Sequence, residues 1–92
     1  MNEDFYEQCL NEPFDEEYNR MAYKIGKEYH DTCEAYDQTV CQHKNERGVA
    51  IPTTGYELGL VGKNARMVMK DISVRYRISP EDVHRFVRDY YG

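Results

Sequence analysis

The chain has no tryptophan, only three cysteines and three prolines, and no long apolar run. Three cysteines at irregular spacing do not form a disulfide framework, which requires paired cysteines. Residues 1–14 are acidic, whereas a secretory signal begins with basic residues and continues into an apolar stretch. No apolar run approaches the roughly 20 residues of a membrane-spanning helix. We therefore expect a soluble protein of a reducing cytoplasm that has no membrane partner.

Positive charge is also scarce, with 12 lysines and arginines against 17 aspartates and glutamates, a net charge of −5. The residues up to Cys41 include eleven acidic and three basic side chains, a net of −8. The residues from Gln42 onward include nine basic and six acidic side chains, a net of +3. Proteins that bind DNA or RNA usually present a broad basic face. We therefore expect no binding to a nucleic-acid duplex, and we place any anion chemistry in the second half of the chain.

Catalytic signatures are missing as well. The sequence contains no phosphate-binding glycine motif, no nucleophile elbow and no metalloprotease motif. The many carboxylates of the first forty residues lie on the side that we expect water to cover. The chain is therefore predicted not to be an enzyme and to need no cofactor.

Apolar residues follow a helical period over much of the chain. In the first half they recur in steps of mostly 3 and 4, which predicts one helix from Pro13 to Thr39. The members of this stripe are Phe14, Tyr18, Met21, Ala22, Ile25, Tyr29, Cys33, Tyr36 and Val40. Gly26 interrupts it at a cost of about 1 kcal/mol relative to alanine, unless another element packs closely there.

Two later segments begin with helix-capping signals. Thr54-Gly55-Tyr56-Glu57 has the form of a capping box and opens a second long helix. Ser79 followed by Pro80 predicts the start of a last helix that ends near Tyr90. The fold class is therefore all-α: one domain, residues 1–92, with two long antiparallel helices and short terminal helices. Residues 1–12 are expected to form an N-terminal extension that contains a short helix.

The second helix carries more apolar surface than one antiparallel neighbour would cover. Its stripe of Leu58, Val61, Ala65, Val68, Ile72 and Tyr76 is widened by Leu60, Met67 and Met69. A domain of this size buries only about 60–65 % of its unfolded surface, so its own core is marginal. The nine tyrosines suit a protein interface or a stacking surface. We therefore expect the chain to form a homo-oligomer.

Two other kinds of site have weaker support. His30, Cys33, Cys41 and His43 include the short spacings HxxC and CxH, but Cys33 belongs to the apolar stripe and CxH is unlike a zinc finger, so no metal site is expected. Residues 55–91 could form a helix-turn-helix. Its last helix would turn Glu81, Asp82 and Asp89 toward phosphates, which makes it a poor recognition helix.

The segment Gln42–Thr53 is a long loop for so small a domain, which is a feature of functional loops. Lys44 and Arg47 in this loop can donate charge-assisted hydrogen bonds to phosphate oxygens. Tyr29, on the preceding helix, could stack on a base. On spacing alone, however, a tyrosine on a helical stripe is more often a core residue, and a charged loop is more often simply solvated.

The strings YHDTCEAYDQTVC (29–41) and AIPTTGYELGLVGKNAR (50–66) together resemble the anti-CBASS sponges of bacteriophages. These small helical proteins assemble as homohexamers and sequester cyclic oligonucleotides without cleaving them. The resemblance implies intact cyclic dinucleotides, such as 3′,3′-cGAMP, in pockets shared between protomers. It also implies that the protein blocks CBASS-type signalling in the host bacterial cytoplasm.

The resemblance also assigns residues. An aromatic residue of the first long helix stacks on a base in the family, and a lysine just beyond the cysteine contacts phosphate; here these are Tyr29 and Lys44. Asn45 and Arg47 belong to the same predicted ligand site. A second pocket, for cyclic trinucleotides, is predicted to use His30, Arg66 and Arg85. The alternative is an acidic phage protein that inhibits a host enzyme by direct protein–protein contact, a hypothesis suggested by the net charge of −8 before Gln42.

Overall fold

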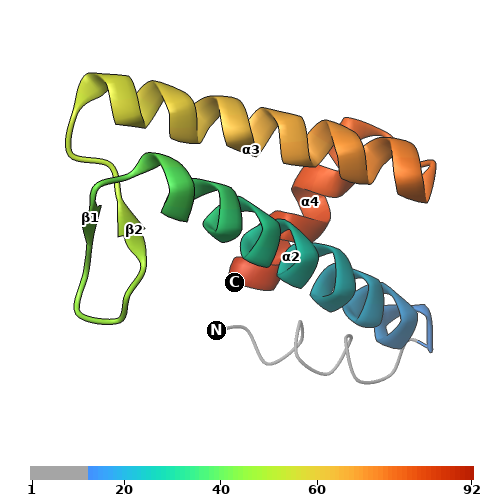
Figure 1. Ribbon diagram of the computed structural model, residues 1–92. Helices are drawn as coiled ribbons and strands as arrows, with labels where there is room; N and C mark the ends of the chain where they lie inside the picture. The colour runs from blue at the N-terminus through green and yellow to red at the C-terminus, as the bar shows by residue number, and fades with distance from the viewer. Residues whose placement is uncertain (1–12) are drawn as a thin grey trace.

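The computed structural model describes residues 13–92, which are mostly helical (Figure 1). The elements are α2 (Pro13–Val40), β1 (His43–Lys44), β2 (Ala50–Ile51), α3 (Gly55–Tyr76) and α4 (Pro80–Tyr91). The all-α prediction is confirmed, apart from two strands of two residues each. The expected short helix of the N-terminal extension lies outside the described residues.

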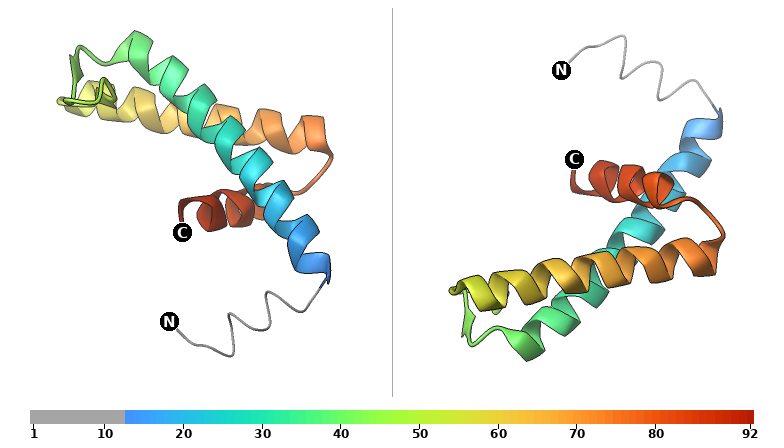
Figure 2. Two further views of the ribbon diagram at one scale, coloured as in Figure 1. Left: turned by 90° about the horizontal axis from the view of Figure 1, so that it is seen from below. Right: turned by 90° about the horizontal axis from the view of Figure 1, so that it is seen from above.

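The two long helices, α2 and α3, cross each other obliquely, and a hairpin of β1 and β2 joins them at one end (Figures 1 and 2). The short helix α4 turns back from the far end of α3 and packs against α2. None of the helices in residues 13–92 combines the length and the apolarity that a membrane crossing would require.

The apolar core lies where α4 meets the two long helices. Each helix contributes one side chain with no exposed surface, namely Ile25, Ile72 and Val83. Four further residues complete the buried cluster: Ala22, Val68, Phe86 and Val87. Four of these positions, Ala22, Ile25, Val68 and Ile72, belong to the helical stripes predicted from the sequence, because residues three or four apart share one face of a helix.

The expectation that the apolar stripes are buried was wrong for the ends of α2 and α3 that lie near the hairpin. Tyr36 is 44 % exposed and Leu58 is 62 % exposed, although both follow the apolar period of their helices. The reason is that α4 has only 12 residues and covers the other half of the α2–α3 pair. Near the hairpin no third helix of the described part covers these side chains.

Local capping explains where α3 and α4 begin and why the chain reverses between them. The Thr54 hydroxyl accepts a hydrogen bond from the Glu57 N–H at 3.1 Å, and the Ser79 hydroxyl accepts one from the Asp82 N–H at 3.1 Å. Both caps were predicted from the sequence, and each satisfies a backbone donor of a first helical turn. At the other end of α3, Arg77 adopts a left-handed conformation with φ 57°, which reverses the chain toward α4.

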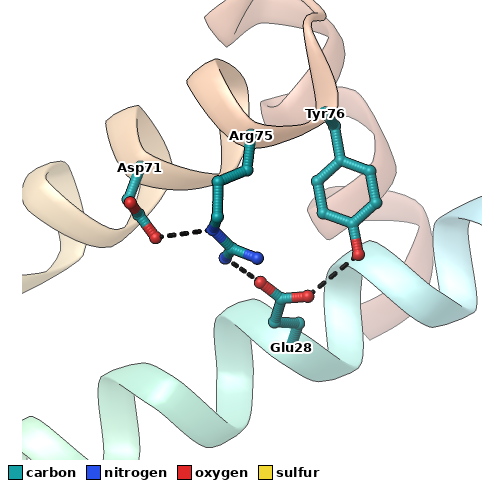
Figure 3. Close-up of polar contacts among 4 residues, drawn as sticks. All are labelled: Glu28, Asp71, Arg75 and Tyr76. Atoms are coloured by element: carbon teal, nitrogen blue, oxygen red, sulfur yellow. Dashed lines mark hydrogen bonds and ion pairs between the residues drawn. The ribbon is translucent and has the colours of Figure 1, made fainter.

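A polar cluster ties α2 to α3 beside the apolar core (Figure 3). The carboxylate of Glu28 accepts hydrogen bonds from the guanidinium of Arg75 and, at 2.9 Å, from the hydroxyl of Tyr76. Arg75 also donates to Asp71 at 2.9 Å. Burial raises the pKa of Tyr76, and the hydrogen bond to Glu28 raises it further. Glu28 therefore holds two consecutive side chains of α3 and helps to set the crossing of the two long helices.

Gly26 marks the closest approach of α4 to α2. A Cβ atom placed on Gly26 would lie 2.1 Å from the Cβ and 2.3 Å from the Cγ of Tyr90. These are atoms near the backbone that cannot swing aside as the tip of a flexible side chain can. The glycine inside the predicted helix is therefore explained by the packing of Tyr90 against the bare backbone.

We expect Gly26→Ala to destabilise the protein by about 1–3 kcal/mol, because the added methyl group would force α4 away from α2. Gly59 in α3 is the matched control, since a Cβ there would meet nothing within 4 Å. Gly59→Ala should stabilise the fold by about 0.5–1 kcal/mol through helix propensity alone. Urea unfolding followed by circular dichroism measures both changes. Equal stability of the two variants would contradict the proposed contact.

Candidate functional site

The predicted loop Gln42–Thr53 is an ordered β-hairpin. Its strands are antiparallel, with His43 opposite Ile51 and Lys44 opposite Ala50. At the turn, the N–H of Asn45 donates to the carbonyl of Val49 at 2.9 Å. The basic residues thus stand on a backbone with defined hydrogen bonds.

The side chain of Asn45 organises the tip of this hairpin. Its Oδ1 atom accepts hydrogen bonds from the N–H of Arg47 at 2.8 Å and from the N–H of Val49 at 2.9 Å. Gly48 completes the turn with φ 78°, a value that favours glycine. Asn45 was predicted to contact a ligand, and the structure gives its carbonyl oxygen a role in shaping the turn. The side-chain NH2 group of Asn45 is then the group available to donate a hydrogen bond to an anion.

Two side chains of α2 hold the tip of the hairpin from the side. The Nε2 atom of Gln38 donates to the carbonyl of Gly48 at 2.6 Å. The carboxylate of Glu34 accepts hydrogen bonds from the N–H of Ala50 at 2.9 Å and from Gln38 at 2.5 Å. The tip is thereby fixed to the last turns of α2. Neither residue was singled out in the sequence, although their i, i+4 spacing on the polar face of a helix indicates that they are neighbours.

The base of the hairpin is held by Glu57 of α3, which is 6 % exposed. Its Oε1 atom accepts hydrogen bonds from the N–H of Thr53 at 3.0 Å and from the hydroxyl of Thr53 at 3.4 Å. Its Oε2 atom accepts a hydrogen bond from the N–H of Gln42 at 3.3 Å. The sequence had placed Glu57 in a capping box, but its carboxylate joins the two ends of the hairpin.

These hydrogen bonds explain the acidity of Glu57. The N–H of Thr53 lowers the pKa of the carboxyl group most, and the N–H of Gln42 and the hydroxyl of Thr53 add to this effect. Burial acts in the opposite direction, and the net result is a pKa below the ordinary value. Glu57 is therefore ionised at neutral pH, as a carboxylate with several donors should be.

The cations of the hairpin face solvent. Lys44 and Arg47 are exposed, and within residues 13–92 neither of them forms an ion pair. The neighbouring carboxylates of Glu34 and Glu57 accept bonds from neutral groups of the hairpin and of Gln38 instead. Glu46 is exposed at the tip and offsets part of the positive charge. The arrangement can bind an anion through a fixed backbone that carries two mobile cationic side chains.

The predicted stacking residue, Tyr29, lies away from this hairpin. It is half-buried and packs against the apolar core, and burial together with the neighbouring Cys33 raises its pKa to about 12. Glu34, which bonds to Ala50 of the hairpin, follows Tyr29 by five positions, so the two side chains leave α2 in directions about 140° apart. One chain therefore does not bring Tyr29 and Lys44 into one site, and a site that uses both must include a second copy.

The three residues of the predicted second pocket also lie apart. The Nδ1 atom of His30 lies 2.9 Å from the hydroxyl of Tyr91. Arg85 forms an ion pair with Asp82 at 2.9 Å and lies over the ring of Tyr18. Tyr18 precedes His30 by twelve positions, or about 18 Å along α2, so Arg85 and His30 are far apart. Arg66 is exposed on α3 and lies along Gly62. No common pocket forms from these three residues in the described part of a single chain.

The residues considered as metal ligands do not lie close together either. In the part of the chain that the structure describes, no group of three or more His, Cys, Asp or Glu residues is placed to hold a metal ion. Cys33 packs against the core, as its place in the stripe predicted, and burial raises its pKa to about 11. Cys41 is buried at the end of α2. His43 lies 3.3 Å from the hydroxyl of Thr53 across the hairpin.

No protein-family model, curated protein or solved structure matches the chain. The functional inference therefore depends on the chemistry of the hairpin and on the sequence resemblance given above. The hairpin offers two exposed cations, an amide group and a backbone fixed to both long helices.

Glu57 should make the stability of the fold depend on pH. Its pKa is lower in the folded chain than the ordinary 4.5, so its stabilising effect is complete above that value and is lost as the pH falls through the folded pKa. We expect Glu57→Gln to be less stable than the wild type at pH 7. The difference between the two should shrink as the pH falls below 4.5.

The matched control is Glu46→Gln, which changes an exposed carboxylate of the same hairpin. Its urea midpoint should follow that of the wild type at every pH between about 3 and 7, because this exposed side chain does not bond to the base of the hairpin. If Glu57→Gln and Glu46→Gln had the same pH profile, Glu57 would not be the residue that holds the base of the hairpin.

Proposed function

We propose that this chain binds and sequesters cyclic oligonucleotides without cleaving them and so blocks CBASS-type antiphage signalling in the host bacterial cytoplasm. Its first ligand class would be cyclic dinucleotides such as 3′,3′-cGAMP, with cyclic trinucleotides as a second class. The observation that carries the proposal is the hairpin, on which Lys44 and Arg47 form no ion pair with any residue of the described part and whose backbone is fixed by Glu34 and Glu57.

The chemistry of the ligand suits this arrangement. A cyclic dinucleotide has two phosphates and two bases, so it needs cationic donors and aromatic faces. A hydrogen bond to a charged group contributes about 1.5–3 kcal/mol, and stacking contributes about 1–3 kcal/mol per base. A few such contacts approach the roughly 12 kcal/mol of nanomolar binding. Binding alone is proposed, because a sponge acts by lowering the concentration of free messenger.

The proposal requires an assembly of several copies. Tyr29 and Lys44 are separate within one chain, so a ligand that contacts both would lie between protomers. The chain is also extended, with a radius of gyration of 15.8 Å, whereas a compact domain of this length has about 12 Å. Exposed tyrosines, of which Tyr23 and Tyr56 are 60 % and 77 % exposed, offer surface for such contacts. A homohexamer built on antiparallel long helices, as the resemblance implies, stays a prediction.

Calorimetric titration with 3′,3′-cGAMP tests the proposal directly. We expect a saturable isotherm with a sub-micromolar dissociation constant, and we expect chromatography to recover the nucleotide unchanged after heat denaturation. The absence of any heat signal across a panel of cyclic di- and trinucleotides would refute the sponge function. The inhibition of a host enzyme by direct contact would then be the next hypothesis to examine.

The site itself is tested by single substitutions in the same titration. Lys44→Ala should weaken binding at least about tenfold, because one charge-assisted contact is lost. Tyr29→Leu should also weaken it about tenfold by removing the stacking face, while Tyr29→Phe keeps the ring and should bind as the wild type does.

Arg20→Ala, which removes an exposed cation far from the hairpin, is the control for the loss of one positive charge. Equal affinities of Lys44→Ala and Arg20→Ala would show that general charge, and not the hairpin, attracts the nucleotide. Circular dichroism of each variant checks that the helices are retained.

A further inference from the structure

A row of cations runs along the outer face of α3. It consists of Lys63, Arg66, Lys70 and Arg77, all of them exposed. Lys63, Arg66 and Lys70 are spaced by 3 and 4 residues, which places them on one side of α3, and Arg77 follows as the C-cap just beyond the end of the helix. Within residues 13–92 none of the four takes part in an ion pair. We call this row the basic face of α3.

Exposed apolar side chains lie beside the basic face. Tyr56 is 77 % exposed, Met67 45 % and Val74 67 %. Their spacings of 11 and 7 residues put them in one row next to the cations. The only acidic residue of α3 other than Glu57 is Asp71, and it pairs with Arg75 toward α2. The outer surface of α3 is therefore both basic and apolar.

No described element covers this surface. Both α2 and α4 lie on the opposite side of α3, and the view from above shows α3 unobstructed (Figures 1 and 2). An exposed apolar row beside a row of cations is typical of a protein interaction site, and the exposed Asp71, paired with Arg75, lies on the other side of the row. Such a surface is complementary to an acidic partner that also carries apolar residues.

The chain itself contains a segment of that composition. Residues 1–12 include four acidic side chains and no basic one, with Phe5, Tyr6 and Leu10 among them. Twelve residues precede α2, and they can extend to about 40 Å at most. Within α3 the cations from Lys63 to Lys70 span about 10 Å, and Arg77 follows the end of the helix. The segment is therefore long enough to follow the whole row.

We propose that the acidic segment of residues 1–12 docks on the basic face of α3 of a second copy of the chain. A second copy is proposed because the start of α2 (blue) lies on the far side of α4 from α3 in its own protomer (Figure 2). Tyr56, Met67 and Val74 supply the apolar contact, and the charges set the register of the segment. The contact explains why the chain divides into an acidic first part and a basic second part.

This interface uses neither Lys44 nor Arg47 of the proposed dinucleotide site, and it shares only Arg66 with the predicted trinucleotide pocket. Its failure would leave the sponge function possible through another assembly contact. A chain that assembles in this way but binds no cyclic nucleotide would refute the sponge function alone. The two proposals are thus distinguished by measuring mass and nucleotide affinity separately.

Native mass spectrometry and light scattering of the full chain test the interface. We expect the wild type to be oligomeric, and the double variant Lys63→Glu/Lys70→Glu to raise the dissociation constant of the assembly at least tenfold. The triple variant Glu3→Lys/Asp4→Lys/Glu7→Lys should do the same from the other side. Mixing the two variants should restore assembly, because the reversed charges are again complementary.

The control is Arg20→Glu/Lys24→Glu, which makes the same charge change on α2 and should keep the wild-type mass. A monomeric wild type, an unchanged mass for Lys63→Glu/Lys70→Glu, or a failure of the mixture to reassemble would each overturn the proposal. If the double variant lost its helical signal, the triple variant, which leaves α3 intact, would decide between these outcomes.

Nucleic acid is the other anion that such a face could bind. A labelled 20-nucleotide single strand should show no binding to the wild type above that of Lys63→Glu/Lys70→Glu. Retention of the strand by the wild type alone, weakened by added salt while the oligomer mass stayed unchanged, would assign the basic face to nucleic acid and overturn the proposal.

Discussion

The close packing of Tyr90 on Gly26 is the contact on which the rest of the fold depends. Because residue 26 has no Cβ, α4 can approach the backbone of α2, and this approach closes Val83 over Ile25 and Ile72. A helix of 12 residues covers only one half of the crossing between α2 and α3. The apolar core is therefore confined to that half, and the other half needs a different kind of support.

Hydrogen bonds to carboxylates supply that support near the hairpin. Glu34 and Glu57 accept N–H donors of the hairpin and hold its tip to α2 and its base to α3. Because these two acids bond to neutral groups, the nearby Lys44 and Arg47 keep their full charge toward solvent. The hydrogen bonds that hold this half of the fold together thus leave Lys44 and Arg47 available to bind a phosphate.

The sequence predicted the local features of the fold well. The caps at Thr54 and Ser79 depend on groups within three residues, so they could be predicted without any knowledge of packing. Glu34 and Gln38 were missed because their partners lie ten to sixteen residues away, across a turn whose shape the sequence does not state. Tyr36 was wrongly expected in the core, since helical period alone does not tell where a third helix ends.

The sequence by itself determined the helices, their starting points, the division of charge and the presence of a basic loop between the long helices, whereas the β-hairpin in that loop was seen only in the structure. These follow from periodicity and from bonds between near neighbours. Only the tertiary structure decided which part of each stripe is covered, what Glu57 holds, and that Tyr29 and Lys44 lie apart in one chain. Such properties depend on elements that are distant in sequence, because burial and electrostatics are set by what packs against a residue and not by its neighbours along the chain.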